Sequence, residues 1–148
     1  CEFLMAGHPG VDVSPLAKVA SGGELSRIGL AIFTLTSRNT SVPTLIFDEV
    51  DSGVGGATGE VVGRMMKQLG QTRQVLCVTH LPQVAACGDH HLKVEKVSDG
   101  IETVSYLREL APAQRVEEIA RMLGGLLITQ KTKVLAEEMV KANLSQEE

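Results

Sequence analysis

At the centre of this sequence is the stretch Thr44-Leu45-Ile46-Phe47-Asp48-Glu49, a short apolar run that ends in two neighbouring carboxylates. Its apolar residues do not alternate with polar ones, which is typical of a strand covered on both faces. A second apolar run occupies residues 75–79 and is followed by His80. These two runs predict two buried strands, each with polar side chains at its carboxyl end.

A helix is predicted between the two strands. Its apolar positions recur along one face and end before Gly70; they are Val61, Val62, Met65, Met66 and Leu69. A strand, a helix and a strand within about 35 residues form a right-handed unit with parallel strands. Residues 53–60, which lead into this helix, are interpreted as a flexible connector. Asp51, just before them, is a candidate for contact with another subunit.

Open parallel sheets bind their ligands beyond the carboxyl ends of the strands. Because neighbouring strands lie about 4.8 Å apart, we expect Glu49 and His80 to reach one small ligand. Adjacent carboxylates suit phosphoryl transfer: Asp48 would hold Mg²⁺ through water, and Glu49 would orient the water that attacks a γ-phosphate. His80 would bind or sense that phosphate. The alternative interpretation of Asp48 and Glu49 is a solvated strand end.

A glycine turn, Ser21-Gly22-Gly23-Glu24, precedes the first strand and opens a helix. The turn predicts a capping box, in which Ser21 and Glu24 bond each other's backbone. It also fits an anion site, since free N–H groups and the positive end of a helix favour phosphate. The helix is expected from Glu24 to about Ser37 and to be well buried. Four apolar residues mark one of its faces: Leu25, Ile28, Ile32 and Leu35.

The flanking elements are simpler. We expect a short strand, a loop, a hairpin and two helices, at residues 3–6, 7–15, 92–107, 116–123 and about 129–142. The hairpin is expected to turn at Ser98-Asp99-Gly100. The cluster of cysteine, aspartate and histidines at residues 87–91 matches no zinc spacing, so a surface loop is the preferred interpretation.

The composition fits one domain with an aliphatic core, because the 148 residues are 43% hydrophobic and only 3% aromatic. A net charge of −4 gives no sign of a nucleic-acid groove, and no apolar stretch approaches the roughly 20 residues of a membrane span. The sequence begins at Cys1, with no initiator Met and no secretory signal, so we expect a fragment of a longer chain. Three cysteines without C-x-x-C argue for a reducing compartment.

Four motifs in this order resemble those of ABC-type ATPases. Residues 20–27 resemble the signature motif, and Thr44 to Glu49 the Walker B strand. Residues 50–53 lie at the position of the D-loop, and Thr79-His80 at that of the switch histidine. The exact sequences of residues 19–27, 46–51 and 78–85 resemble one family in particular, the RecN family of bacterial DNA repair proteins, which are SMC-like ATPases. The resemblance extends over about residues 16–125.

The resemblance implies an α/β fold. Residues 1–148 would be the C-terminal segment of a split ABC/SMC-type ATPase head, with the Walker A half and the coiled coil absent. A parallel sheet would be flanked by helices, with a terminal β-hairpin and two C-terminal helices. The family acts in double-strand-break repair by recombination, and its heads sandwich two ATP molecules. The implied partners are the N-terminal half-head, a second head and DNA, with no membrane, in the cytoplasm at the nucleoid.

The resemblance also assigns roles to individual residues. Ser21, Gly22 and Gly23 would touch the γ-phosphate held by the other subunit. Asp48 would serve Mg²⁺, and Glu49 and His80 would be catalytic on their own subunit's ATP. The ATP-binding set implied by the motifs is Ser21, Gly22, Gly23, Glu24 and Asp51.

Two alternatives remain open. The sequence contains no G-x-x-x-x-G-K-[ST] loop, so the chain alone is expected to bind ATP poorly. It would then be a non-catalytic interaction module that completes a partner's nucleotide site. The other alternative is an ATPase subunit of a transporter from the same superfamily, which the Glu-Leu-Ser-Arg wording after the glycines disfavours by resemblance.

Overall fold

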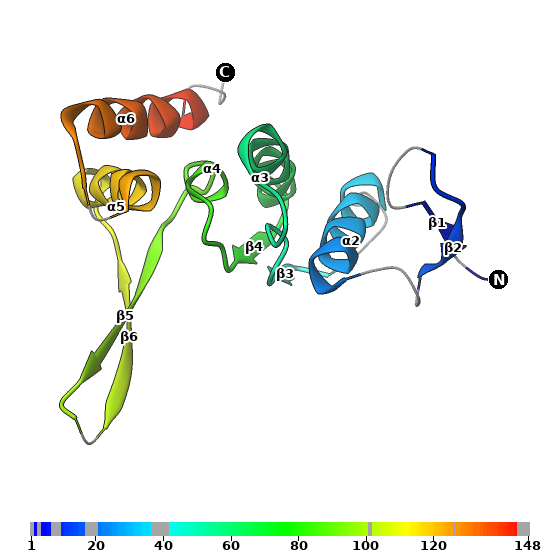
Figure 1. Cartoon of the computed structure of the whole chain (residues 1–148), viewed down its shortest axis with the longest axis horizontal. Helices are drawn as coiled ribbons and strands as arrows, with labels where there is room; N and C mark the ends of the chain where they lie inside the picture. Colours follow the sequence, from blue (N-terminus) through cyan, green and yellow to red (C-terminus); the bar gives the residue numbers. More distant parts are fainter. Residues whose placement is uncertain are drawn as a thin grey trace.

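A parallel strand pair with helices packed on it forms the centre of the molecule (Figure 1). The computed structural model describes residues 2, 4–6, 10–16, 21–36, 42–100, 102–125 and 127–144. Strand β3 (Thr44–Phe47) lies beside β4 (Gln74–Cys77), with Thr44 opposite Gln74 and Phe47 opposite Cys77. The predicted parallel pairing is therefore confirmed, and with it the α/β class.

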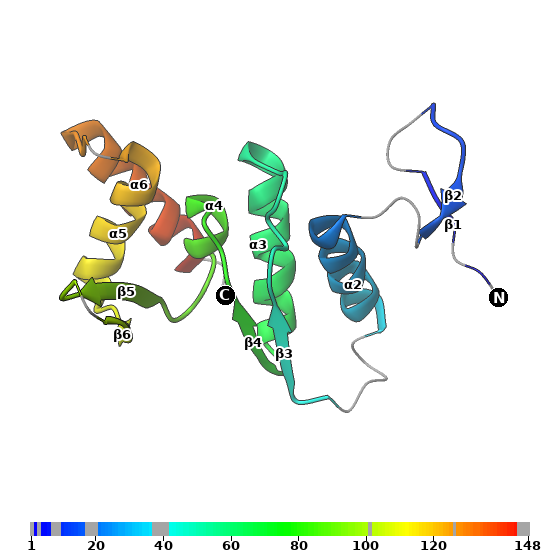
Figure 2. The same ribbon diagram turned by 60° about the horizontal axis from the view of Figure 1, so that its bottom comes forward.

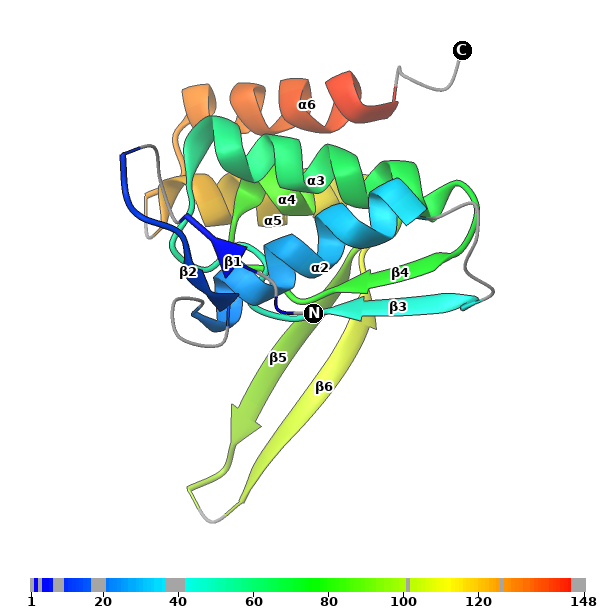
Figure 3. The same cartoon turned by 90° about the vertical axis from the view of Figure 1, so that its right-hand side faces the viewer.

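Helix α3 (Gly56–Gly70) connects the two strands, as the sequence predicts. It begins inside the stretch interpreted as a flexible connector, so residues 56–60 are helical. Helix α2 (Gly22–Thr36) packs on α3. Figures 2 and 3 show both helices on the same side of the β3–β4 pair.

The two faces of this strand pair differ. Leu45 and Phe47 point into a cluster of buried side chains that also contains Leu30, Val50, Val62, Met66, Leu69 and Val84. Ile46, on the other face, is 71% exposed, and Leu76 and Val78 beside it are also exposed. The prediction that these strands are covered on both faces is wrong for this chain. Successive strand residues alternate sides, and the described residues supply helices for one side only.

Helix α2 is also less buried than the sequence predicts. Of its residues only Gly23 and Leu30 are buried. Leu25, Ile32 and Leu35, three of the four residues on the predicted apolar face, are exposed, Leu35 by 85%. On the side of α2 away from α3, the described elements are only the short strands β1 and β2 (Figure 1), and α2 packs mainly on α3.

Short elements account for the remaining differences. β1 (Leu4–Met5), part of the predicted strand, pairs antiparallel with β2 (Ser14–Pro15), which lies within the predicted loop; residues 7–9 of that loop lie outside the described residues. α4 (Pro82–Ala85) was not predicted. Strand β2 and helix α4 have two and four residues, which is too few to show a hydrophobic period, and neither forms an uninterrupted apolar run.

The predicted hairpin and C-terminal helices are present. β5 (Leu92–Ser98) pairs antiparallel with β6 (Thr103–Glu109), and the hairpin projects away from the helices (Figure 1). Helices α5 (Pro112–Gly124) and α6 (Gln130–Leu144) pack together on a second cluster: Ala86, Ile119, Ala120, Ala136 and Val140.

Buried charges join this second cluster to its surroundings. The Arg115 guanidinium is 6% exposed and donates to the carbonyl oxygens of Ala86, at 2.9 Å, and Gly88. Glu118 accepts from Arg121 and Lys93, and these bonds, that from Arg121 above all, lower its pKa to about 2. In the described ranges, no helix is long and apolar enough to cross a membrane.

Candidate functional site

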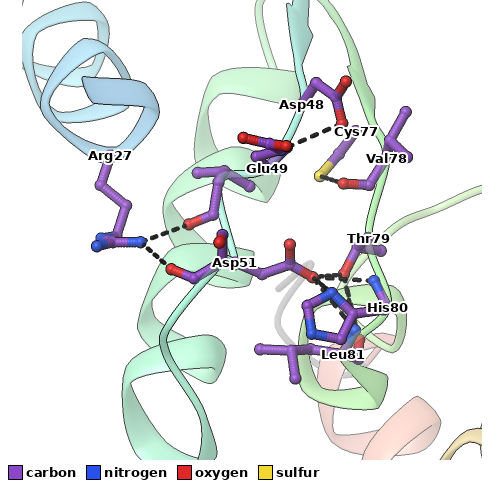
Figure 4. Close-up of polar contacts among 11 residues, drawn as sticks. Arg27, Asp48, Glu49, Asp51, Cys77, Val78, Thr79, His80 and Leu81 are labelled. Carbon is purple, nitrogen blue, oxygen red and sulfur yellow. Dashed lines mark hydrogen bonds and ion pairs between the residues drawn. The ribbon is translucent and has the colours of Figure 1, made fainter. Parts of the chain in front are cut away.

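Two loops leave the β3–β4 pair at the same edge. The Val78 N–H donates to the Phe47 carbonyl at 2.9 Å, which extends the pairing by one residue beyond β4. Asp48 and Glu49 follow β3, and Thr79 and His80 follow Val78 on the neighbouring chain segment (Figure 4). The neighbouring placement of these two strand ends is thus confirmed, whereas the chemical roles of their side chains stay predictions.

Asp48 and Glu49 are both exposed at this edge. The Glu49 N–H donates to Asp48 Oδ1 at 2.9 Å, which orients the Asp48 carboxylate (Figure 4). Glu49 has a φ of 57°, a left-handed conformation that residues other than glycine seldom adopt. Such strained backbone is often found where function requires it.

This donor set fits Mg²⁺ held mainly by water and phosphate. Carboxylate oxygens suit that hard cation, which keeps several waters and is usually bound through one or two carboxylates. No group of three or more His, Cys, Asp or Glu side chains could enclose a metal within the described parts of the chain. Asp48 can therefore contribute an oxygen to a phosphate-bound ion, and no protein cage is formed for a free one.

The N-terminus of α2 lies against the loop after β3. The predicted capping box is confirmed: the Ser21 N–H donates to Glu24 Oε2 at 2.7 Å, and the Glu24 N–H to Ser21 Oγ at 3.3 Å. The bond from the Ser21 backbone lowers the pKa of Glu24. A Cβ added to Gly22 would lie 2.8 Å from Glu49 Oε2, and one added to Gly23 would lie 2.8 Å from Ser52 Cβ. Gly23 is therefore needed for close packing within this chain, whatever it binds, whereas at Gly22 the flexible end of the Glu49 side chain can move aside.

Two further side chains of α2 hold the same loop. Ser26 Oγ donates to the Asp48 carbonyl at 2.9 Å. The Arg27 guanidinium donates to the Ser52 carbonyl at 2.7 Å and to the Val50 carbonyl at 3.3 Å (Figure 4). Ser26 and Arg27 belong to the stretch that resembles the signature motif, but the sequence analysis assigns neither of them a role. A hydrogen bond from a side chain to a backbone carbonyl far along the chain cannot be predicted from residue types or their spacing, because every residue has such a carbonyl.

Asp51 joins the two loops. Its Oδ2 accepts from Thr79 Oγ1 at 2.5 Å, from the His80 N–H at 2.9 Å and from the Leu81 N–H at 3.2 Å. His80 Nδ1 lies 3.3 Å from the same oxygen (Figure 4). Burial alone would raise the pKa of Asp51, but the bonds from Thr79 and the backbone outweigh it, and the pKa is lowered.

The position of Asp51 corrects one expectation. The carboxylate is 2% exposed, so its side chain is not available for the subunit contact that the sequence suggests. The His80 side chain, by contrast, is 72% exposed. Thr79, to which the sequence assigns no separate role, is the hydroxyl that binds Asp51.

Among the described residues, Cys77 and Cys87 belong to no group of three or more side chains that could hold a metal ion. Burial, followed by the charges of Asp51 and Asp48, raises the pKa of Cys77 to about 12, so its thiol is protonated. Cys87 is 1% exposed, and a Cβ on Gly63 would lie 2.7 Å from its Sγ. The interpretation of residues 87–91 as a surface loop is therefore wrong for Cys87 and holds for Gly88, Asp89 and His90, which are exposed.

Comparison with known proteins decides the family. No protein-family model matches the chain. It is 50% identical over 140 residues to the DNA repair protein RecN of Vibrio cholerae, and 51% identical over 138 residues to that of Haemophilus influenzae. These alignments cover 95% and 93% of the chain. The chain belongs to the RecN family. It spans about a quarter of the length of these relatives, 25% in each case, and corresponds to the C-terminal part of RecN.

A RecN protein from another bacterium matches over a similar extent. The Halalkalibacterium halodurans protein is 45% identical over 139 residues, or 94% of this chain and 25% of its own length. Among solved structures, the Smc head domain from Pyrococcus yayanosii gives a TM-score of 0.59 at 25% identity, over 74% of this chain and 20% of that chain. An SMC ATPase studied for ATP-driven dimerization and DNA-stimulated activation gives 0.56 at 23% identity, over 80% and 70%. The fold is that of an SMC ATPase head.

Proposed function

We propose that this chain supplies one part of a composite ATP-hydrolysing site in a RecN-type head. Residues 20–27 would be the signature motif, Thr44 to Glu49 the Walker B strand, residues 50–53 the D-loop and His80 the switch histidine. The whole protein would couple ATP binding and hydrolysis to the repair of DNA double-strand breaks by recombination.

The observation that carries this proposal is the in-register parallel pairing of β3 with β4. It brings the carboxylates of one loop and the histidine of the next to a single sheet edge, where α/β proteins bind ligands. Because α2 begins against the same loop, residues 21–23 lie beside this edge as well. Membership in the RecN family and the SMC-head fold support the same assignment.

Each side chain has a separate task in this proposal. Glu49 would hold the attacking water and accept its proton, and the exposed His80 ring would donate to the γ-phosphate. Asp48 would hold Mg²⁺, which neutralises charge on the phosphate oxygens when it is bound. Ser21 and the backbone N–H groups of Gly22 and Gly23 would bind the γ-phosphate of ATP on a second head, at the positive end of α2.

The implied partners follow from what the chain lacks. The N-terminal half-head would bring the phosphate loop and cover the open face of β3–β4, and a second head would complete the ATP sandwich. DNA would be contacted through the full-length protein, because a net charge of −4 offers no phosphate-neutralising surface. A protein with this role would work in the cytoplasm at the nucleoid.

The first test is steady-state ATP hydrolysis by the chain alone and mixed with the N-terminal segment of its RecN-type parent. Hydrolysis is expected only in the mixture, because the chain has no phosphate loop of its own. Equal hydrolysis by the chain alone would contradict the composite site.

Replacing Glu49 tests the catalytic assignment in the active mixture. Glu49→Gln removes the base but keeps the size of the side chain. We expect a fall in the turnover number of about 10²-fold or more, with ATP still bound and heads still dimerised. Glu60→Gln, in an exposed i,i+4 pair with Arg64 on α3, is the matched control and should leave turnover unchanged. Wild-type turnover in Glu49→Gln would remove Glu49 from the mechanism.

A second candidate function is a non-catalytic interaction module. The exposed apolar side chains of Ile46, Leu76 and Val78 favour it, since they form a surface suited to another polypeptide. Turnover in the mixture with the N-terminal segment separates the two: a module that contributes no catalytic side chain predicts unchanged turnover in Glu49→Gln, whereas the composite site predicts its loss. The transporter alternative has no support among the RecN relatives.

A further inference from the structure

The charged side chain of Asp51 lies inside the protein and not at its surface. Among the described residues it is the most deeply buried carboxylate, at 2% exposure. We propose that Asp51 is a positioning residue, which holds the loop carrying His80 in the geometry needed for ATP hydrolysis. This inference rests on the proposed function and assigns Asp51 a task different from direct ATP binding.

The hydrogen bonds of Asp51 all lead to one loop. Oδ2 accepts from the Thr79 hydroxyl and from the backbone N–H groups of His80 and Leu81, at 2.5, 2.9 and 3.2 Å. These donors come from three consecutive residues, so a single oxygen fixes the backbone on both sides of the His80 Cα. Bonds to an ionised acceptor are stronger than neutral ones, which makes this contact a firm attachment of the loop.

The same oxygen also faces the His80 ring. Nδ1 lies 3.3 Å from Asp51 Oδ2, while 72% of the side chain is exposed. An acceptor beside Nδ1 favours the proton on that nitrogen and sets the plane of the ring. In this proposal, Nε2 would then be the ring nitrogen that binds the phosphate.

Asp51 is itself held in place from α2. Arg27 donates to the carbonyl oxygens of Val50 and Ser52, the two neighbours of Asp51 in sequence. The turn at residues 50–52 is therefore held from two sides. Helix α2 bonds its carbonyl oxygens, and the His80 loop bonds the Asp51 side chain. A rigid support of this kind is what places a side chain within the tolerance that catalysis requires.

The experiment uses the chain mixed with its N-terminal segment and measures ATP turnover. Asp51→Asn keeps the shape of the side chain but removes its charge. We expect kcat to fall by about 10- to 100-fold, the range seen when the outer partners of a site are removed, with the KM for ATP unchanged within about twofold. Asp99→Asn is the matched control: Asp99 also accepts a backbone N–H, from Glu102 at 2.8 Å, but in the turn of the projecting hairpin. It should leave kcat unchanged.

A double substitution separates positioning from general damage to the fold. If Asp51 acts through His80, adding Asp51→Asn to His80→Ala should lower kcat by no more than about twofold further. Losses that multiply instead would overturn the proposal, as would wild-type kcat in Asp51→Asn. If Asp51→Asn does not fold, Thr79→Val removes the hydroxyl donor in its place. Thr79→Val should lower kcat, Thr79→Ser should restore it, and equal kcat in both would overturn the proposal.

Failure of this inference can be distinguished from failure of the proposed function. Full turnover in both Glu49→Gln and His80→Ala would contradict the composite site itself. Reduced turnover in those two variants, with full turnover in Asp51→Asn, would leave the site standing and remove only the positioning role of Asp51.

Discussion

The two faces of the β3–β4 pair are built from the same kinds of residue but have opposite surroundings. Leu45 and Phe47 are 6% and 7% exposed beneath α2 and α3, whereas Ile46 between them is 71% exposed. The covered face belongs to a core that this chain completes alone. The open face is equally apolar and has no cover among the described elements. The difference therefore shows that only one face of the strand pair is packed within this chain. Stability and assembly can therefore be tested on separate side chains.

The largest effect is expected on the covered face. Phe47→Ala should lower the free energy of unfolding of the chain by about 3–5 kcal/mol, because it leaves a cavity in the cluster around Leu30 and Val62. Urea unfolding followed by circular dichroism measures this. A loss no greater than that of Ile46→Ala would show that the two faces do not differ as described.

The contact between α2 and the loop after β3 should give the next largest effect. In Gly23→Ala the new Cβ would lie 2.8 Å from Ser52 Cβ and 3.0 Å from two backbone oxygens. We expect a loss of about 1–3 kcal/mol from this overpacking. Gly29→Ala in the same helix is the control, because nothing lies within 4 Å of its added Cβ. It should stabilise by up to about 1 kcal/mol; similar unfolding midpoints for the two variants would contradict the close approach.

The acid dependence of stability tests the buried carboxylate. The pKa of Asp51 is lowered from its ordinary 3.8 in the folded protein, so its contribution is fully present above that value and is lost as pH falls through the folded pKa. The difference in unfolding free energy between wild type and Asp51→Asn should be constant near neutral pH and shrink below about pH 4. The comparison with Asp51→Asn removes the effect of the other carboxyls, and a pH-independent difference would be inconsistent with a lowered pKa.

The smallest effect on stability is expected on the open face. Ile46→Ala should change the unfolding free energy of the chain by less than about 0.5 kcal/mol, because the side chain has little burial to lose. The same substitution should weaken binding to the N-terminal segment, measured by calorimetric titration. Undiminished binding would show that the open face is not the surface the N-terminal segment covers.

The elements with a clear apolar run or an apolar stripe were predictable from the sequence. The run at residues 44–47, the stripe ending at Leu69 and the run at residues 75–79 predict the β3–α3–β4 unit, which the structure confirms with small shifts at the ends. The capping box was predictable too, because Ser21 and Glu24 interact within one helical turn. In each case the signal is local, because the apolar run, the apolar stripe or the capping pair lies within one element.

The long-range contacts of the site were not predictable. Arg27 bonds to carbonyl oxygens more than twenty residues away, at Val50 and Ser52. Asp51, a candidate for subunit contact from the sequence, is buried and bonded to residues 79–81 instead. Backbone acceptors are identical in every residue, so the sequence carries no sign of which of them a side chain will reach.

The sequence by itself determined β3, α3, β4, the hairpin and the C-terminal helices, together with the order of the site's motifs, because apolar patterning, capping and chain direction are local properties. It also determined that residues 48–49 and residue 80 follow the carboxyl ends of two strands. Only the tertiary structure decided that one face of β3–β4 stays open, that Gly23 packs on Ser52 and that Asp51 turns inward to hold His80. Each of these depends on which distant segments share a space, and burial and hydrogen-bond partners are set by that packing rather than by residue type.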